Sequence, residues 1–151
     1  MVKVFILFLC IFGYSITSVK ASEINMPFGE WLVSCKQNMM TAKNDCFIGT
    51  QFSNDDGRGA IVFTKYYLAV AHNETNLNKG VDFEVDKNQI ISSFMNTGVS
   101  VFFKNDDRQR LLSQMQKGNN LNINIKGKDR VVKSLNGFID AYNFYINQIE
   151  S

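Results

Sequence analysis

The chain is poor in the residues that most catalytic and metal sites need. Among its 151 residues are one histidine, three cysteines, one tryptophan and one proline. The single histidine, His72, supplies neither a paired zinc site nor a spare base for a cysteine or serine nucleophile. No serine lies in a Gly-x-Ser-x-Gly elbow. We therefore expect a protein that is not an enzyme and that has no catalytic residue, metal ligand or cofactor. We expect His72 to lie in a surface loop.

The chain also lacks an excess of charge of either sign. It has 16 basic and 14 acidic residues, a formal net charge of +2. Without Lys3 and Lys20, near the N-terminus, the two signs are equal in number, and the remaining charges are interspersed. A nucleic-acid partner would require a basic patch, and so would a charged membrane surface. We expect neither partner.

The N-terminus has the pattern of a secretory signal peptide. Lys3 precedes an uncharged apolar run over residues 4–16, and Val19-Lys20-Ala21 fits the small-x-small rule for cleavage. The run is shorter than the roughly 20 residues of a membrane-spanning helix, although a retained anchor is the alternative. We predict cleavage after Ala21, no transmembrane segment thereafter, and a single domain over residues 22–151. The protein would be exported: periplasmic, outer-membrane-associated or secreted.

The cysteines then have one possible pairing. Cys10 leaves with the signal peptide, so only Cys35 and Cys46 remain. Exported proteins meet an oxidising compartment, where disulfides persist. We predict a structural disulfide that stabilises the fold by about 3 kcal/mol in the chain-entropy model. A free nucleophile and a metal ligand are the alternatives for Cys35.

Hydrophobic periodicity predicts a mainly β domain. The expected strands are residues 28–37, 46–52, 60–71 (one long strand or two short ones, buried on much of both sides), 81–86, 90–94, 99–103 and 121–125. Asn105 is the expected N-cap of a short helix that ends at Lys117-Gly118, and Ser134 that of a C-terminal helix. The fold class is a β-sandwich or a barrel-like antiparallel sheet with these two helices.

Two groups of residues are candidates for binding. Asp82, Glu84 and Asp86 alternate with apolar residues, which places the acids on the exposed face of a strand. A calcium loop is not expected there, because Lys87 and Ser93 replace the glycine and glutamate that such a loop needs. Tyr66 and Tyr67 can line a groove, although core packing explains most aromatic residues of this chain.

Two motifs lie at opposite ends of residues 22–151. The first is Phe28-Gly29-Glu30-Trp31 followed by Cys35 and Cys46, and the second is Ser134-Leu135-Asn136-Gly137-Phe138 followed by Ala141. In this order they resemble the F-G-x-W-x-x-x-C strand and the S-L-x-G-F-x-x-A ending of the invasion-associated locus B family. The family's second cysteine pair has no counterpart here, because Phe94 and Val99 occupy the matching positions.

The resemblance implies an exported bacterial protein of β-rich fold, a family associated in some members with host-cell invasion and virulence. It implies no catalytic residues. We therefore expect an interaction module that binds a host protein or an envelope component. The alternatives are a small-ligand carrier with an aromatic cavity, and a hydrolase that uses two carboxylates among Asp82, Glu84, Asp106 and Asp107.

Overall fold

The structure is a computed structural model that describes residues 22–55, 57–73, 77–93, 95–98, 100–126 and 130–150. The predicted signal peptide, residues 1–21, lies outside the described residues, as do Phe94 and Val99. Over the described residues the chain forms eleven strands and two helices. The mainly β fold class with a C-terminal helix is confirmed. The strands form two separate antiparallel sheets, and neither sheet closes on itself.

The larger sheet is an antiparallel meander extended by a late hairpin. Its spatial order is β1 (Glu23–Phe28), β2 (Trp31–Gln37), β3 (Asn44–Asn54), β4 (Gly57–Thr64), β5 (Leu68–His72), β9 (Ser100–Phe102) and β8 (Met95–Asn96). The segment predicted as 60–71 divides at a turn into parts of β4 and β5. Strand β1 was not predicted. It contains Pro27, which a sheet tolerates because β1 is an edge strand.

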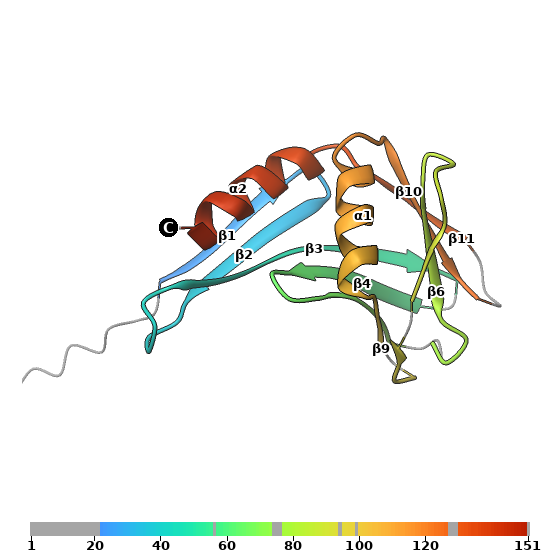
Figure 1. Cartoon of the computed structure of the whole chain (residues 1–151), viewed down its shortest axis with the longest axis horizontal. Helices are drawn as coiled ribbons and strands as arrows, with labels where there is room; N and C mark the ends of the chain where they lie inside the picture. The colour runs from blue at the N-terminus through green and yellow to red at the C-terminus, as the bar shows by residue number, and fades with distance from the viewer. Residues whose placement is uncertain are drawn as a thin grey trace, which may run out of the picture.

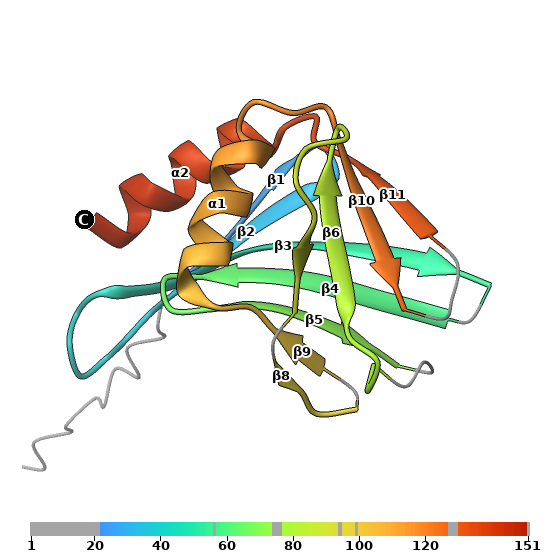
Figure 2. The same ribbon diagram turned by 45° about the vertical axis from the view of Figure 1, so that its right-hand side comes forward.

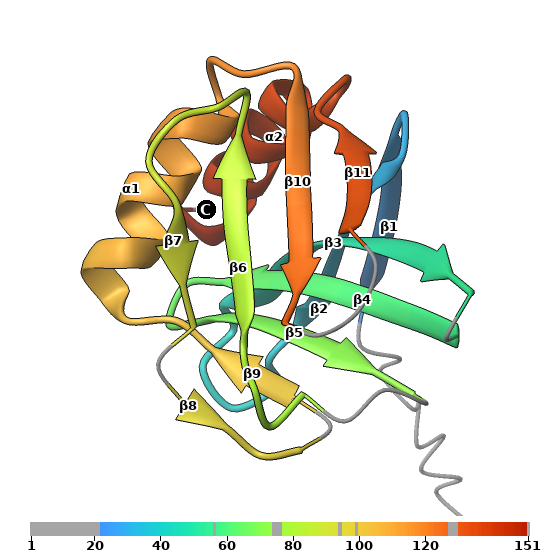
Figure 3. The same cartoon turned by 90° about the vertical axis from the view of Figure 1, so that its right-hand side faces the viewer.

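The smaller sheet has the order β11 (Arg130–Ser134), β10 (Asn120–Ile125), β6 (Val81–Val85) and β7 (Ile91–Ser92). Of the strand predicted at 90–94, only Ile91–Ser92 forms a described strand, and it pairs with β6, while the hairpin partner of β9 is β8, which begins at Met95. In Figure 3 the strands of the smaller sheet run upright and cross β3, β4 and β5 of the larger sheet behind them. Such crossing is one of the common ways in which two sheets bury their apolar faces.

Both helices lie on the same side of the larger sheet as the smaller sheet (Figure 1). Helix α2 (Phe138–Glu150) covers β1, β2 and β3, and α1 (Asn105–Met115) stands between α2 and the smaller sheet (Figure 2). The core fills the space that these elements enclose. Trp31 lies at its centre: its ring packs edge-on against Phe138 at 4.8 Å, and its Nε1 donates a hydrogen bond to the Ser134 carbonyl at 3.1 Å.

The predicted disulfide is present. Cys35 and Cys46 lie directly opposite each other on β2 and β3, with Cα atoms 4.0 Å apart. Such a short separation is typical of a non-hydrogen-bonded antiparallel pair, the position where side chains are closest. Both cysteines are buried on the face of the sheet that α2 covers. Cys35 is therefore neither a free nucleophile nor a metal ligand in this structure.

Three local predictions are wrong. Helix α1 begins at Asn105 and has Lys104 at its cap position without a side-chain capping bond, so Asn105 is not the cap. Ser134 ends β11, and α2 begins after Gly137. Gly137 has φ of +84°, and a Cβ there would collide with the Phe28 carbonyl, so close packing requires a glycine.

His72 does not lie in a surface loop. It ends β5 and is 3% exposed, with Nε2 3.2 Å from Asn54 Oδ1.

Candidate functional site

Tyr66 and Tyr67 occupy the turn between β4 and β5, and both lie at the surface. Their side chains are 78% and 43% exposed. The hydroxyl of Thr64 accepts hydrogen bonds from both tyrosine amides, at 3.2 Å and 3.1 Å, which fixes the turn. The turn forms one wall of an open groove of about 460 Å³, which is also bordered by the β2–β3 connection and by Ile149 of α2. The structure thus places both tyrosines along a groove.

The predicted acids lie on the smaller sheet, away from this turn. Asp82 and Glu84 share the outer face of β6, while Val81, Phe83 and Val85 on the other face are fully buried. Each acid has a basic neighbour: Lys126 Nζ is 3.3 Å from Asp82, and Arg130 Nη2 is 3.1 Å from Glu84. The space beside them amounts to only about 60 Å³. This arrangement is that of a half-buried, ion-paired strand face.

Asp86 does not share that face. It follows β6 with φ of +45°, and its carboxylate accepts hydrogen bonds from the amides of Asn119 and Asn120 at 2.6 Å and 2.9 Å. These two hydrogen bonds hold the connection between α1 and β10 against the end of β6. Asp106 and Asp107 lie in the first turn of α1, where they complement the helix dipole, and Asp107 pairs with Arg110 at 2.7 Å. Among the described residues, no group of three or more His, Cys, Asp or Glu side chains could hold a metal ion.

A larger candidate site covers the face of the larger sheet that points away from the helices. Paired residues on all of its strands form one cross-strand row: Pro27, Leu32, Gly49, Val62, Ala69, Phe102 and Met95. The row contains no charged or polar side chain. No described element covers this face, since both helices and the smaller sheet lie on the opposite side (Figure 1).

Two features shape this uncovered face. Phe47 neighbours the row, and its ring lies against Gly49, where a Cβ would be 3.3 Å from the ring. Leu32, Phe47 and Gly49 border an open groove of about 420 Å³ over β2, β3 and β4. Toward the other end, the Tyr67 ring meets Phe102 edge-on at 6.1 Å. The surface therefore combines a shallow hollow with aromatic walls.

The sequence contained a sign of this face, in strands that are apolar at consecutive positions. In β4, Ile61 and Phe63 lie on one face and Val62 on the other. In β3, Ile48 lies on one face and Phe47 on the other. Each strand is therefore apolar on both faces. That pattern predicted burial on both sides of residues 60–71. The structure covers only the inner face: Ile61 and Phe63 are buried, whereas Val62 stays partly exposed.

Comparisons of the chain with protein-family models, with curated proteins and with solved structures gave no match. The geometry described above is therefore the basis for any functional conclusion. Within the described ranges, no helix is long and apolar enough to cross a membrane.

Proposed function

We propose that this chain is an exported bacterial interaction module of the invasion-associated locus B type. Its partner, a host protein or an envelope protein, docks on the uncovered face of the larger sheet. The observation that carries the proposal is the uncharged row that crosses every strand of that sheet. Apolar residues that stay exposed on a sheet face without a covering element favour an interaction surface.

The docking face is rigid, which favours affinity. Its residues lie on strands held by neighbours on both sides, except at the edges, and β2 and β3 are also joined by the disulfide. A surface that is already ordered loses little conformational entropy on binding. The partner's contact surface should be apolar and aromatic, because a charged group buried here would find no counter-charge in the row.

The contact between the two sequence motifs supports the family resemblance. Gly29 of the first motif lies against the second, since a Cβ on it would be 2.9 Å from the Asn136 carbonyl oxygen. Gly137 of the second lies even closer to the Phe28 carbonyl, and Trp31 packs on Phe138. Residues more than 100 positions apart thus form one structural unit, which explains why both motifs would occur together.

The disulfide supports the exported location. Cys35 and Cys46 form a buried bond, and such bonds persist in oxidising compartments outside the cytosol. The alternative functions have less support. The grooves around this sheet are open rather than enclosed as in a carrier's cavity, and Asp82, Glu84 and Asp107 are each engaged with a basic side chain.

The test places one lysine on the docking face and another elsewhere. In Val62→Lys the new charge lies at the centre of the row, whereas in Val132→Lys the same change lies on an exposed position of β11. Both lysines can extend to water, so both variants should fold. A photo-reactive residue at position 102 reports contact with the face, and one at the exposed Ile139 of α2 serves as its control.

Residues 22–151, carrying these probes, are exposed to envelope extracts and to host-cell surfaces. We expect one protein to crosslink from position 102 and not from position 139. The V62K change should reduce its capture at least tenfold, and V132K less than twofold. Equal capture by V62K and the unchanged protein would refute the docking face, as would equal losses in both variants or no position-specific crosslink.

A further inference from the structure

Helix α1 carries a buried cation that has no acidic partner. Arg108 is 5% exposed, and among the described residues no carboxylate lies within ion-pair distance of it. Its Nη2 donates to the Thr64 carbonyl at 2.6 Å, and Nη1 lies 3.5 Å from Asn105 Oδ1. Nε has no hydrogen-bond partner within these described segments. A buried charge without a counter-charge is costly, so the site is electrostatically incomplete.

A second unpartnered donor comes from helix α2. Tyr145 is 3% exposed, and in the part of the chain that the structure describes its hydroxyl has no hydrogen-bond partner. Burial raises the pKa of Tyr145 from 10.0 to about 12, and the nearby positive charge of Arg108 acts in the opposite direction. The hydroxyl therefore keeps its proton at neutral pH. The Arg108 Nε and the Tyr145 hydroxyl thus both lack a hydrogen-bond partner among the described residues, and they lie close enough for the Arg108 charge to act on Tyr145.

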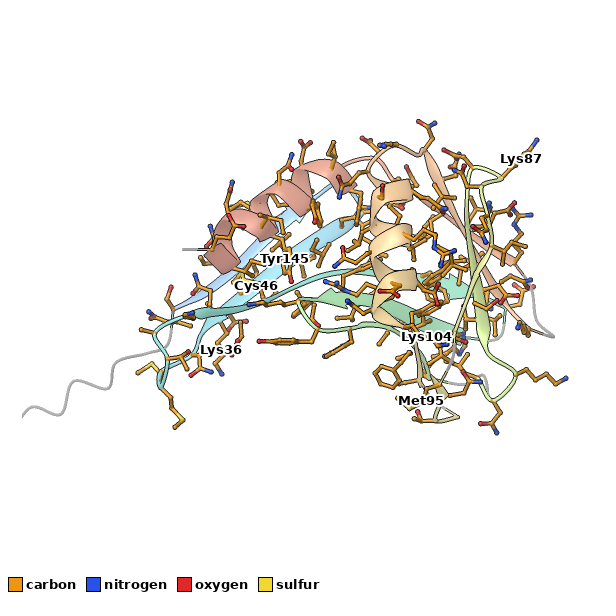
Figure 4. The ribbon with its side chains drawn as sticks, viewed as in Figure 1. Lys36, Cys46, Lys87, Met95, Lys104 and Tyr145 are labelled. Atoms are coloured by element: carbon orange, nitrogen blue, oxygen red, sulfur yellow. A yellow bond between two sulfur atoms is a disulfide. The ribbon has the colours of Figure 1, made fainter. Side chains whose placement is uncertain are left out.

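This region adjoins the groove beside Tyr66 and Tyr67. Thr64 belongs to both, because its carbonyl accepts the Arg108 bond and its side chain borders the groove. Cys46 also borders the groove, and Figure 4 shows Tyr145 beside it, pointing from α2 toward the larger sheet. Lys43 and Lys65 add positive charge to the groove wall against the single acid Asp45, whose carboxylate accepts a bond from Asn38 at 3.0 Å.

We propose that this groove binds a small organic carboxylate whose apolar part lies against Tyr66 and Tyr67. Its carboxylate accepts hydrogen bonds from Arg108 Nε and Tyr145 Oη. A carboxylate supplies both the acceptors and the negative charge that the site lacks, and charge-assisted bonds of this kind are strong. Both donor atoms are buried and neither residue borders the groove, so binding requires the ligand to displace the turn that carries Tyr66, against the two hydrogen bonds to the Thr64 hydroxyl. The site does not depend on the proposed docking face, although the two share Tyr67, which borders the groove and whose ring meets Phe102.

Benzoate is the probe, because it joins a carboxylate to one aromatic ring, and benzamide is its neutral counterpart of the same shape. Binding is measured by calorimetry and by the ligand-dependent rise in melting temperature of residues 22–151. Arg108→Met removes the buried charge at similar length, and Arg110→Met makes the same change on the exposed side of α1. Tyr145→Phe and Tyr66→Ala test the other two contacts, and Tyr66 is exposed enough for its variant to fold.

We expect benzoate to stabilise the protein and benzamide to have no effect. Benzoate affinity should fall at least tenfold in R108M, several-fold in Y145F and Y66A, and less than twofold in R110M. Without ligand, R108M should melt no lower than the unchanged protein, because it removes an uncompensated buried charge. If R108M does not fold, the Y145F and Y66A results decide.

Several results would overturn the proposal. One is a protein that benzoate does not stabilise, which would mean that ordered water alone satisfies the two donors. Equal affinity losses in R108M and R110M would indicate a non-specific charge effect. Inorganic phosphate that bound as well as benzoate, with the same dependence on Arg108, would refute the carboxylate assignment.

Discussion

Breaking the Cys35–Cys46 bond should lower the free energy of unfolding by about 3 kcal/mol. The two cysteines are 11 residues apart, and closing a loop of this length restricts the unfolded chain by that amount in the chain-entropy model. The folded state should change little on reduction. The cysteines are directly opposed in the β2–β3 register, and the neighbouring pairs Val33↔Ile48 and Leu32↔Gly49 keep the ladder in place.

Equilibrium urea unfolding of residues 22–151, with and without a reductant, measures this effect. The reduced protein should remain folded at 25 °C, because the free energy of unfolding of a domain of this size is commonly about 5–15 kcal/mol. Its melting temperature should fall by about 10 °C. The double variant Cys35→Ala, Cys46→Ala provides the control. It should lose slightly more stability because two buried sulfur atoms are absent, and it should not respond to the reductant.

Two outcomes would contradict this reasoning. A loss below about 1 kcal/mol would mean that the unfolded chain is already restricted between β2 and β3, so that the bond removes little entropy. Complete unfolding on reduction at 25 °C would mean that the ladder cannot hold without the bond. A reductant effect on the double alanine variant would show that reduction acts elsewhere.

Two further changes have expected outcomes. Gly59→Ala should destabilise the protein by about 1–3 kcal/mol in urea unfolding, because its Cβ would collide with the Phe52 ring opposite it on β3; unchanged stability would mean that the ring can move aside. Tyr145→Phe should remove part of the alkaline loss of stability. Since the pKa of Tyr145 is raised to about 12, its contribution is complete below pH 10.0 and is lost between pH 10.0 and 12. Identical profiles for Y145F and the unchanged protein over this range, measured by circular dichroism, would refute the assignment.

Much of the secondary structure could be predicted because it depends on neighbours along the chain. The alternation of Val81, Phe83 and Val85 with two acids predicted β6, and the structure buries all three apolar residues. The apolar spacing from Phe138 onward predicted α2. The disulfide followed from counting cysteines and from the expected compartment, and needed no geometry.

The candidate site was less predictable. Tyr66 and Tyr67 do border a groove, as their aromatic character allowed, but the sequence placed them within a segment expected to be buried on much of both sides, whereas they lie exposed in a turn between β4 and β5. Asp82, Glu84 and Asp86 were expected together, but Asp86 turns away to bind the amides of Asn119 and Asn120. Two consecutive left-handed residues after β6, Asp86 and Lys87, made that difference, and side-chain alternation contains no information about them.

Amino-acid order alone shows which residues avoid water, where the chain turns and which cysteines can meet. These properties depend on local periodicity, backbone preferences and composition. The same order does not show what covers each face of a strand, because covering elements come from distant parts of the chain. Val62 and Ile61 are adjacent and both apolar, yet only Ile61 faces the smaller sheet and helices. Folding in three dimensions likewise buried His72 and Arg108, and it left one face of the larger sheet uncovered.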